Sequence, residues 1–241
     1  MEYYLMKICV VLPVLKKKIF EEMTRKELEA ARRKDVEIDI VSIEKGPASI
    51  ESAYDEGVAA PWILEKIKEA EEKGFDAAII DCMCDPALQG AREIVSIPIV
   101  GPCQASMAIA SILCDKFSVI TVLRSVLPQF RRLAKEYGFE SKVASVRSVE
   151  VPVLELREKR GEVRARLLAE SKKAIEEDEA GAIILGCTGM IGMARELQEA
   201  LGIPVIDPAV ASMKLAESLV DMKISHSKLV YPKPPEKERR L

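Results

Sequence analysis

The sequence predicts an α/β protein in which two similar parallel-sheet domains, related by pseudo-two-fold symmetry, face each other across a cleft. Two observations predict this architecture. Short apolar runs alternate with longer charged, amphipathic stretches, which is typical of βαβ units. In addition, residues 78–106 and 183–212 repeat each other: each copy has an apolar run ending in one cysteine, then Ala-Arg-Glu, then Ile-Pro, and finally Ala-Ser.

The individual elements follow from local patterns. The run from Ile8 to Leu15 predicts a first buried strand, and continuous apolar runs such as Ala77 to Ile80 fit a sheet that is covered on both faces. The longer charged stretches between these runs predict helices. We therefore expect strands at 6–12, 36–43, 76–82, 97–101, 117–123, 143–147, 182–187 and 203–206, and helices at 18–33, 57–73, 86–95, 125–137, 162–178, 190–201 and 209–222.

The repeat sets the expected domain boundaries. Residues 1–105, together with a last helix and its continuation at 209–226, form the first domain, and residues 106–208 form the second. The proline-rich, charged tail at 227–241 is expected to be a disordered end or a loosely packed arm. Since no low-complexity linker separates the two halves, they should pack against each other.

Composition narrows the class of protein. The 241 residues are 49% hydrophobic and 31% charged, which is a globular composition, and the net charge of −3 gives no bulk attraction to nucleic acid. No apolar run is long enough to span a bilayer, no signal-peptide pattern is present, and no glycine-rich nucleotide motif occurs. We expect a cytoplasmic protein that binds a small molecule, with neither nucleic acid nor membrane as a partner.

The cysteines are the residues with the clearest chemical potential. Six occur, but there is one Cys-x-Cys, no Cys-x-x-Cys, and a single histidine, His226, so we expect no metal site. A lone cysteine after an apolar strand is usually core packing. Cys82 and Cys187, however, occupy equivalent positions in the two copies, which favours a functional pair. Cys9 and Cys114 are expected in the core, and the repeat gives Cys103 no support as a functional residue, because the second copy has Ala209 in its place.

Two facing thiols can remove a proton from one face of a carbon and return it on the other. Each cysteine precedes a predicted helix, whose N-terminus would lower the thiol pKa. Two nearby thiolates repel, which predicts one thiolate and one thiol at rest. Asp81, if near Cys82, would raise that thiol's pKa, and Asp85-Pro86 predicts a helix start with Asp85 as the N-cap.

Several neighbouring residues are candidates for contacting a ligand. Thr188 and Gly189 follow Cys187 and provide a hydroxyl and an open backbone, and Cys84 lies beside Cys82. The segment 45–52, with Ser49, suits a loop that closes over a pocket, although an ordinary strand-to-helix connection explains it equally well. Thr121 lies in the corresponding segment of the second half.

Taken in order, these motifs resemble the aspartate/glutamate/hydantoin racemase superfamily, and within it the hydantoin racemase branch. The matching pieces are Gly46-Pro-Ala-Ser-Ile-Glu51, Cys82-Met-Cys-Asp-Pro86, Ile97-Pro-Ile-Val-Gly101, Arg124-Ser125, Val151-Pro-Val-Leu154 and Leu185-Gly-Cys-Thr-Gly-Met190. The resemblance implies two flavodoxin-like domains, a homo-oligomer, and proton transfer by Cys82 and Cys187 without a cofactor. It also implies that backbone amides near Met83 and Cys84, and near Thr188 and Gly189, bind substrate carbonyls.

The chain departs from this branch at two places. An Asn-Pro-Asn-type loop usually follows the first strand, where this chain has Leu12-Pro13-Val14, leaving Pro13 as the loop's candidate contact, and Asp81 replaces a small residue. We expect a racemase of 5-substituted hydantoins. The alternatives are an aspartate/glutamate-type racemase, a one-thiol isomerase or decarboxylase, and a non-catalytic protein that binds a small ligand in the cleft.

Overall fold

The computed structural model describes residues 5–239 and contains two four-stranded parallel sheets. The strand orders are β2-β1-β3-β4 and β6-β5-β7-β8, so each half of the chain repeats the same topology. The strands are β1 (Met6–Leu15), β2 (Val36–Ile43), β3 (Ala77–Ile80), β4 (Ile99–Val100), β5 (Phe117–Thr121), β6 (Val143–Ser148), β7 (Ala182–Leu185) and β8 (Val205–Ile206). The predicted α/β class with two equivalent parallel sheets is confirmed.

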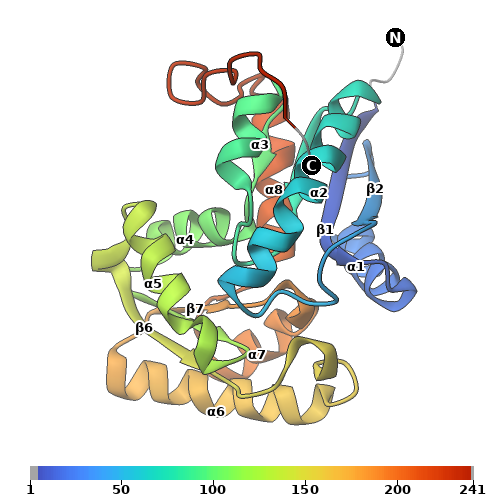
Figure 1. Ribbon diagram of the computed structural model, residues 1–241. Coiled ribbons are helices and arrows are strands. Elements are labelled where there is room, and N and C mark those ends of the chain that lie inside the picture. The colour runs from blue at the N-terminus through green and yellow to red at the C-terminus, as the bar shows by residue number, and fades with distance from the viewer. Residues whose placement is uncertain (1–4, 240–241) are drawn as a thin grey trace.

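Helices cover both sheets. Each sheet, together with its helices, forms one of two lobes (Figure 1). The helices are α1 (Lys18–Ala31), α2 (Ala53–Glu72), α3 (Leu88–Ile94), α4 (Pro102–Leu113), α5 (Leu127–Glu136), α6 (Arg160–Asp178), α7 (Ala194–Leu201) and α8 (Pro208–Asp221). The first lobe contains β1–β4 with α1–α3, and the second contains β5–β8 with α5–α7. No helix within residues 5–239 is long and apolar enough to cross a membrane.

Two helices cross between the halves. α8, at the end of the chain, packs on β3, β4 and α1 of the first lobe, while α4 packs on β7 and α5 of the second and also against α8. Figure 1 shows α8, in orange-red, in the first lobe. The expected boundary between residues 105 and 106 therefore falls inside α4. Because the two crossing helices contact each other, they join the lobes through packed side chains.

Each sheet is buried on both faces. In the first lobe, Ile8 and Val10 of β1 face one apolar core while Cys9 and Val11 face another, as alternation along a strand requires. In the second lobe, the apolar side chains of β5 and β7 belong to one core that also includes Met83 and Cys103 from the first half. Cys9 is thus a core residue, as predicted, and so is Cys103.

The turn after β3 differs from the prediction. The helix expected to begin at Pro86 begins at Leu88, with Ala87 at the N-cap in a left-handed conformation. Asp85 is not its N-cap: its carboxylate accepts hydrogen bonds from the backbone N–H groups of Cys103 (3.0 Å) and Gln104 (2.9 Å) in the first turn of α4. Gly101 makes this possible, because a Cβ there would lie 2.6 Å from the Asp85 carboxyl carbon.

The segment after α8 is held against the first lobe. The Lys228 Nζ donates hydrogen bonds to the carbonyl oxygens of Arg92 (2.7 Å) and Val95 (2.5 Å) at the end of α3. The Nε2 atom of His226 accepts a 2.8 Å hydrogen bond from the backbone N–H of Ile99. Burial lowers the pKa of His226 to about 4, so the ring is neutral and able to accept this bond.

Candidate active site

A pocket lies between the two lobes and is lined by both. The first lobe contributes the end of β1, one face of α1, part of the 45–52 loop and the turn after β3; the second contributes residues 153–157 and the turn after β7. Its lining residues are Leu12, Pro13, Val14, Phe20, Met23, Thr24, Ala48, Ile50, Asp81, Cys82, Val153, Leu156, Arg157, Cys187, Thr188, Gly189 and Ile191. Most of this wall is apolar, so the few polar side chains define the chemistry.

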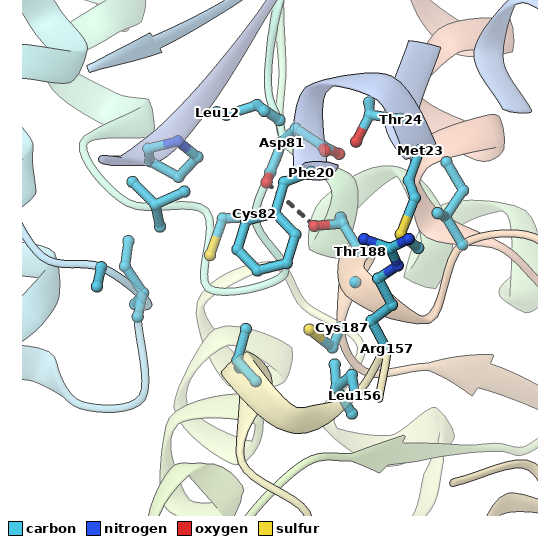
Figure 2. Close-up of a pocket in the computed structure, with 17 residues that line it drawn as sticks. Leu12, Phe20, Met23, Thr24, Asp81, Cys82, Leu156, Arg157, Cys187 and Thr188 are labelled. Atoms are coloured by element: carbon cyan, nitrogen blue, oxygen red, sulfur yellow. Dashed lines mark hydrogen bonds between the residues drawn. The ribbon is translucent and has the colours of Figure 1, made fainter. Parts of the chain in front are cut away.

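Cys82 and Cys187 occupy equivalent places on opposite walls of this pocket (Figure 2). Each lies two residues beyond the last residue of its strand, Ile80 in β3 and Leu185 in β7. Because the carboxyl ends of parallel strands form one edge of a sheet, both thiols open into the cleft. Both are free and half-buried.

A tight contact between strands fixes the position of Cys187. The residue before it, Gly186, lies so close to β5 that a Cβ would stand 2.7 Å from the Cα of Thr121. The Thr121 hydroxyl donates a 3.0 Å hydrogen bond to the Gly186 carbonyl oxygen. Thr121 is fully buried and does not line the pocket, so its observed contact is with the backbone that carries Cys187 and not with a ligand site.

Hydrogen bonds between the lobes cross the cleft beside the cysteines. The Thr188 hydroxyl donates to the backbone carbonyl oxygen of Asp81 at 3.1 Å, which links the residue after one cysteine to the residue before the other (Figure 2). At the rim, Glu51 Oε1 accepts a 2.7 Å hydrogen bond from the backbone N–H of Val153. These bonds set the separation of the two walls.

Burial and a neighbouring thiol control the ionisation of the two cysteines. It raises the pKa of Cys187 to about 12, although the Gly189 backbone N–H, which hydrogen-bonds to the sulfur, acts in the opposite direction. A hydrogen bond with the Cys84 thiol, together with burial, raises the pKa of Cys82 well above its ordinary value. The expected thiolate at rest is therefore wrong for the free protein.

The physical reason lies in the turns that follow the strands. α3 begins only at Leu88 and α7 only at Ala194, so neither thiol lies at the N-terminus of an α-helix. The one-turn 3-10 helix after Cys187, η4 (Thr188–Met190), supplies too few aligned amides to outweigh desolvation.

The remaining predicted contact residues divide into two groups. Pro13, Thr188 and Gly189 line the pocket together with the two cysteines. Met83 is buried in the core of the second lobe, Cys84 is buried beneath Cys82, and the Ser49 hydroxyl donates to Glu51 at 3.2 Å. None of these three lines the pocket; in the loop that contains Ser49, the neighbouring Ala48 and Ile50 do.

Sequence reasoning missed the contribution of α1 and of Arg157. Phe20, Met23 and Thr24 are spaced three and four residues apart, so they share one face of α1, and that face lines the pocket. Their spacing marks a buried helix face but does not distinguish core from pocket. Arg157 is exposed and lines the pocket, and no residue within 5–239 forms an ion pair with its guanidinium. The described residues contain no group of His, Cys, Asp and Glu side chains suited to a metal ion.

Known proteins with similar sequences include racemases. The Asp/Glu/Hydantoin racemase family model matches residues 20–216. A hydantoin racemase from Pseudomonas sp. (strain NS671) is 44% identical over 210 residues, which cover 87% of this chain and 84% of that protein. A hydantoin racemase from Rhizobium meliloti is 40% identical over 190 residues, covering 78% of this chain and 79% of that protein.

Solved structures share the fold. The allantoin racemase from Klebsiella pneumoniae superposes with a TM-score of 0.92 at 34% identity, covering 96% of this chain and 95% of that one. The glutamate racemase from Francisella tularensis, at 15% identity and a TM-score of 0.64, covers 92% of this chain and 84% of that one, and shows the common fold alone. The resemblance stated from the motifs is confirmed: the chain belongs to the Asp/Glu/hydantoin racemase family and is an isomerase of the racemase type.

Proposed function

We propose that this racemase acts on 5-substituted hydantoins without a cofactor, and that Cys82 and Cys187 exchange the proton at C5. One observation carries the proposal: two free, half-buried thiols, one from each lobe, line the same pocket. The names of the relatives support the substrate class, since two are hydantoin racemases and one acts on allantoin, which is a hydantoin with a ureido group at C5.

In this mechanism one cysteine first loses its proton to solvent, and the thiolate so formed removes the C5 proton from one face of the ring. The other cysteine, as thiol, donates its proton to the opposite face, and the two roles exchange for the other enantiomer. Because the Cys84 thiol and burial raise the pKa of Cys82, and burial raises that of Cys187, a thiolate formed in the pocket is strongly basic. A strong base is needed to remove a proton from carbon, because a C–H group is a weak acid even beside a carbonyl.

The negative charge that develops on the substrate needs hydrogen-bond donors. The backbone N–H of Thr188 lies in the pocket wall and donates no hydrogen bond to another described residue. It is therefore available to a carbonyl oxygen of the ring next to C5. A donor already fixed in place stabilises an enolate-like oxygen without reorganisation.

Solvent-deuterium exchange followed by NMR in D2O tests this proposal. Single enantiomers of 5-substituted hydantoins, with aspartate and glutamate in the same panel, are incubated with the protein while optical rotation is recorded. We expect exchange at C5 with loss of rotation in the wild type, and loss of racemisation in both Cys82→Ser and Cys187→Ser. Cys114→Ser, which removes a half-buried thiol outside the pocket, is the matched control and should retain activity.

Other outcomes discriminate among the alternatives. Exchange of aspartate or glutamate but of no hydantoin would identify an amino-acid racemase, which would need Arg157 or backbone amides to hold the carboxylate. Activity that survives in Cys187→Ser but not in Cys82→Ser would identify a one-thiol reaction. Absence of exchange in the whole panel would contradict the proposed substrate class.

The assembly and location of the protein belong to the same proposal. A homo-oligomer is expected from the resemblance to the family, and a cytoplasmic location from the sequence, which has no signal-peptide pattern. Light scattering on the purified protein measures the first property, and a monomer at micromolar concentration would contradict it.

A further inference from the structure

Asp81 is buried in the pocket wall without a partner for its carboxyl group. The residue is 5% exposed, and no described residue forms a hydrogen bond with the Oδ1 atom. Two other buried aspartates, by contrast, have hydrogen-bond donors within the chain. Asp85 accepts three hydrogen bonds, two from α4 amides and one from the Tyr137 hydroxyl, and Asp207 accepts backbone N–H groups at α8 and Gly192. An unpartnered buried carboxyl is costly, so its partner is expected from outside the chain.

The Asp81 carboxyl does not point at the reacting centre. Its backbone carbonyl is bound to Thr188, whereas its carboxyl group points toward Thr24 on α1, and the neighbouring Cys82 thiol points elsewhere in the pocket (Figure 2). Successive side chains of an extended segment alternate in direction, which explains the divergence. Phe20 and Met23, from the same helix as Thr24, make the surrounding wall apolar. This part of the pocket suits a substituent rather than the reacting ring.

The charges around this end of the pocket are negative. The charged residue that acts on Asp81 is Asp207, which is itself influenced by Glu27 on α1. Arg157 also lines the pocket, but it is exposed, and no cation is among the groups that influence Asp81. Burial and Asp207 together raise the pKa of Asp81 to about 7, and a bound cation would reverse this by stabilising the ionised form.

We infer that this end of the pocket binds a cationic group, an ammonium or guanidinium, on the C5 substituent of the substrate, with Asp81 as the residue that determines this specificity. The inference rests on the proposed function and narrows it to hydantoins with a basic side chain. The apolar wall contacts the aliphatic part of the substituent, and Asp81 and the Thr24 hydroxyl receive its charged end. Cys82 and Cys187 then act on C5 at the other end of the molecule.

The test compares matched substituents. Racemisation of 5-(3-aminopropyl)- and 5-(4-aminobutyl)hydantoin is measured against 5-butyl- and 5-pentylhydantoin, which have the same length without the charge, and against allantoin, which offers a neutral N–H donor. We expect the wild type to prefer an amine over its alkyl counterpart by at least tenfold in kcat/KM. Asp81→Asn should abolish that preference through a higher KM for the amine, while the KM for the alkyl compounds changes less than threefold.

A control variant distinguishes a direct contact between Asp81 and the substrate from the general effect of negative charge near the pocket. Glu27→Gln removes one negative charge from α1 outside the pocket lining, so it should change the preference less than threefold. A wild type that racemises alkyl hydantoins as well as the amines would overturn the inference while leaving the proposed function intact. If the protein preferred allantoin over the amines, and this preference depended on Asp81, the inference that the site binds a cation would be overturned.

A binding measurement keeps the two proposals distinguishable. Should no hydantoin be racemised, the proposed function fails, and the inference is decided by thermal shift with the same compounds. Stabilisation of the wild type by the amines but not by the alkyl compounds, lost in Asp81→Asn, supports the cation site. Equal shifts for both compounds or both proteins overturn it.

Discussion

Replacing Asp81 by Asn should stabilise the folded protein, by an amount that depends on pH. Burial and Asp207 raise the pKa of this carboxyl from its ordinary 3.8 to about 7. At pH values between these two pKa values, the Asp81 carboxyl holds a proton in the folded protein that it has released in the unfolded chain. The contribution of Asp81 to stability is therefore fully present below pH about 4 and is lost as the pH rises through about 7. Since each pKa unit corresponds to about 1.4 kcal/mol, ionised Asp81 costs the folded state about 4 kcal/mol at pH 8.5.

Urea denaturation and calorimetry from pH 4.5 to 8.5 measure this effect. We expect the free energy of unfolding of Asp81→Asn to exceed that of the wild type by about 1 kcal/mol at pH 4.5, increasing by about 1.4 kcal/mol per pH unit and becoming constant above about pH 7. At pH 8.5, a difference of about 4 kcal/mol corresponds to a rise in Tm of roughly 10 °C for a chain of this size.

The matched control is Asp115→Asn, which neutralises an exposed aspartate and should change stability by less than about 0.5 kcal/mol at any pH. A difference between Asp81→Asn and the wild type that does not vary with pH would refute the reasoning, because it would show that Asp81 titrates alike in both states. So would a variant less stable than the wild type at pH 8.5.

Three further predictions concern other parts of the site. Gly101→Ala should destabilise the fold by about 1–3 kcal/mol in calorimetry, because its Cβ would displace Asp85, whereas Gly57→Ala, where nothing lies within 4 Å of the new Cβ, should not destabilise it. Thr188→Val should lose about 1 kcal/mol of stability and part of kcat with its hydrogen bond across the cleft, while Thr188→Ser retains both. Alkylation of Cys187 by iodoacetamide, followed by mass spectrometry, should accelerate about tenfold per pH unit from pH 7 to 9, since its pKa is raised to about 12; a plateau above pH 8 would contradict this.

The sequence predicted the features that depend on local pattern or on the repeat. The β-rich runs located the strands, and the duplication selected Cys82 and Cys187, which the fold brings to one pocket from opposite lobes. From the sequence around either cysteine alone, a functional cysteine could not have been distinguished from a core cysteine. The copies support each other because equivalent positions in two similar sheets both lie at the carboxyl edge.

The features that sequence reasoning missed depend on contacts distant along the chain. Asp85 resembles the N-cap of the helix that follows it, but the amides it binds belong to Cys103 and Gln104. Thr121 lies near the end of its strand, yet the close approach of Gly186 directs its hydroxyl to the backbone. The thiol pKa values depend on how completely the lobes bury the sulfurs, and no local pattern reports that burial.

The return of α8 to the first lobe has a consequence for synthesis on the ribosome. Ala209, Met213 and Ala216 of this helix complete an apolar core whose other members come mainly from the first half of the chain. Translation begins at the N-terminus, so one face of the first sheet emerges without its covering helix. It stays uncovered while about 100 further residues are synthesised, which takes roughly 5–20 s. During that interval the nascent chain exposes apolar surface of the kind that chaperones bind. Chains truncated before Pro208 should therefore be released in an aggregation-prone state, however well their second sheet is formed.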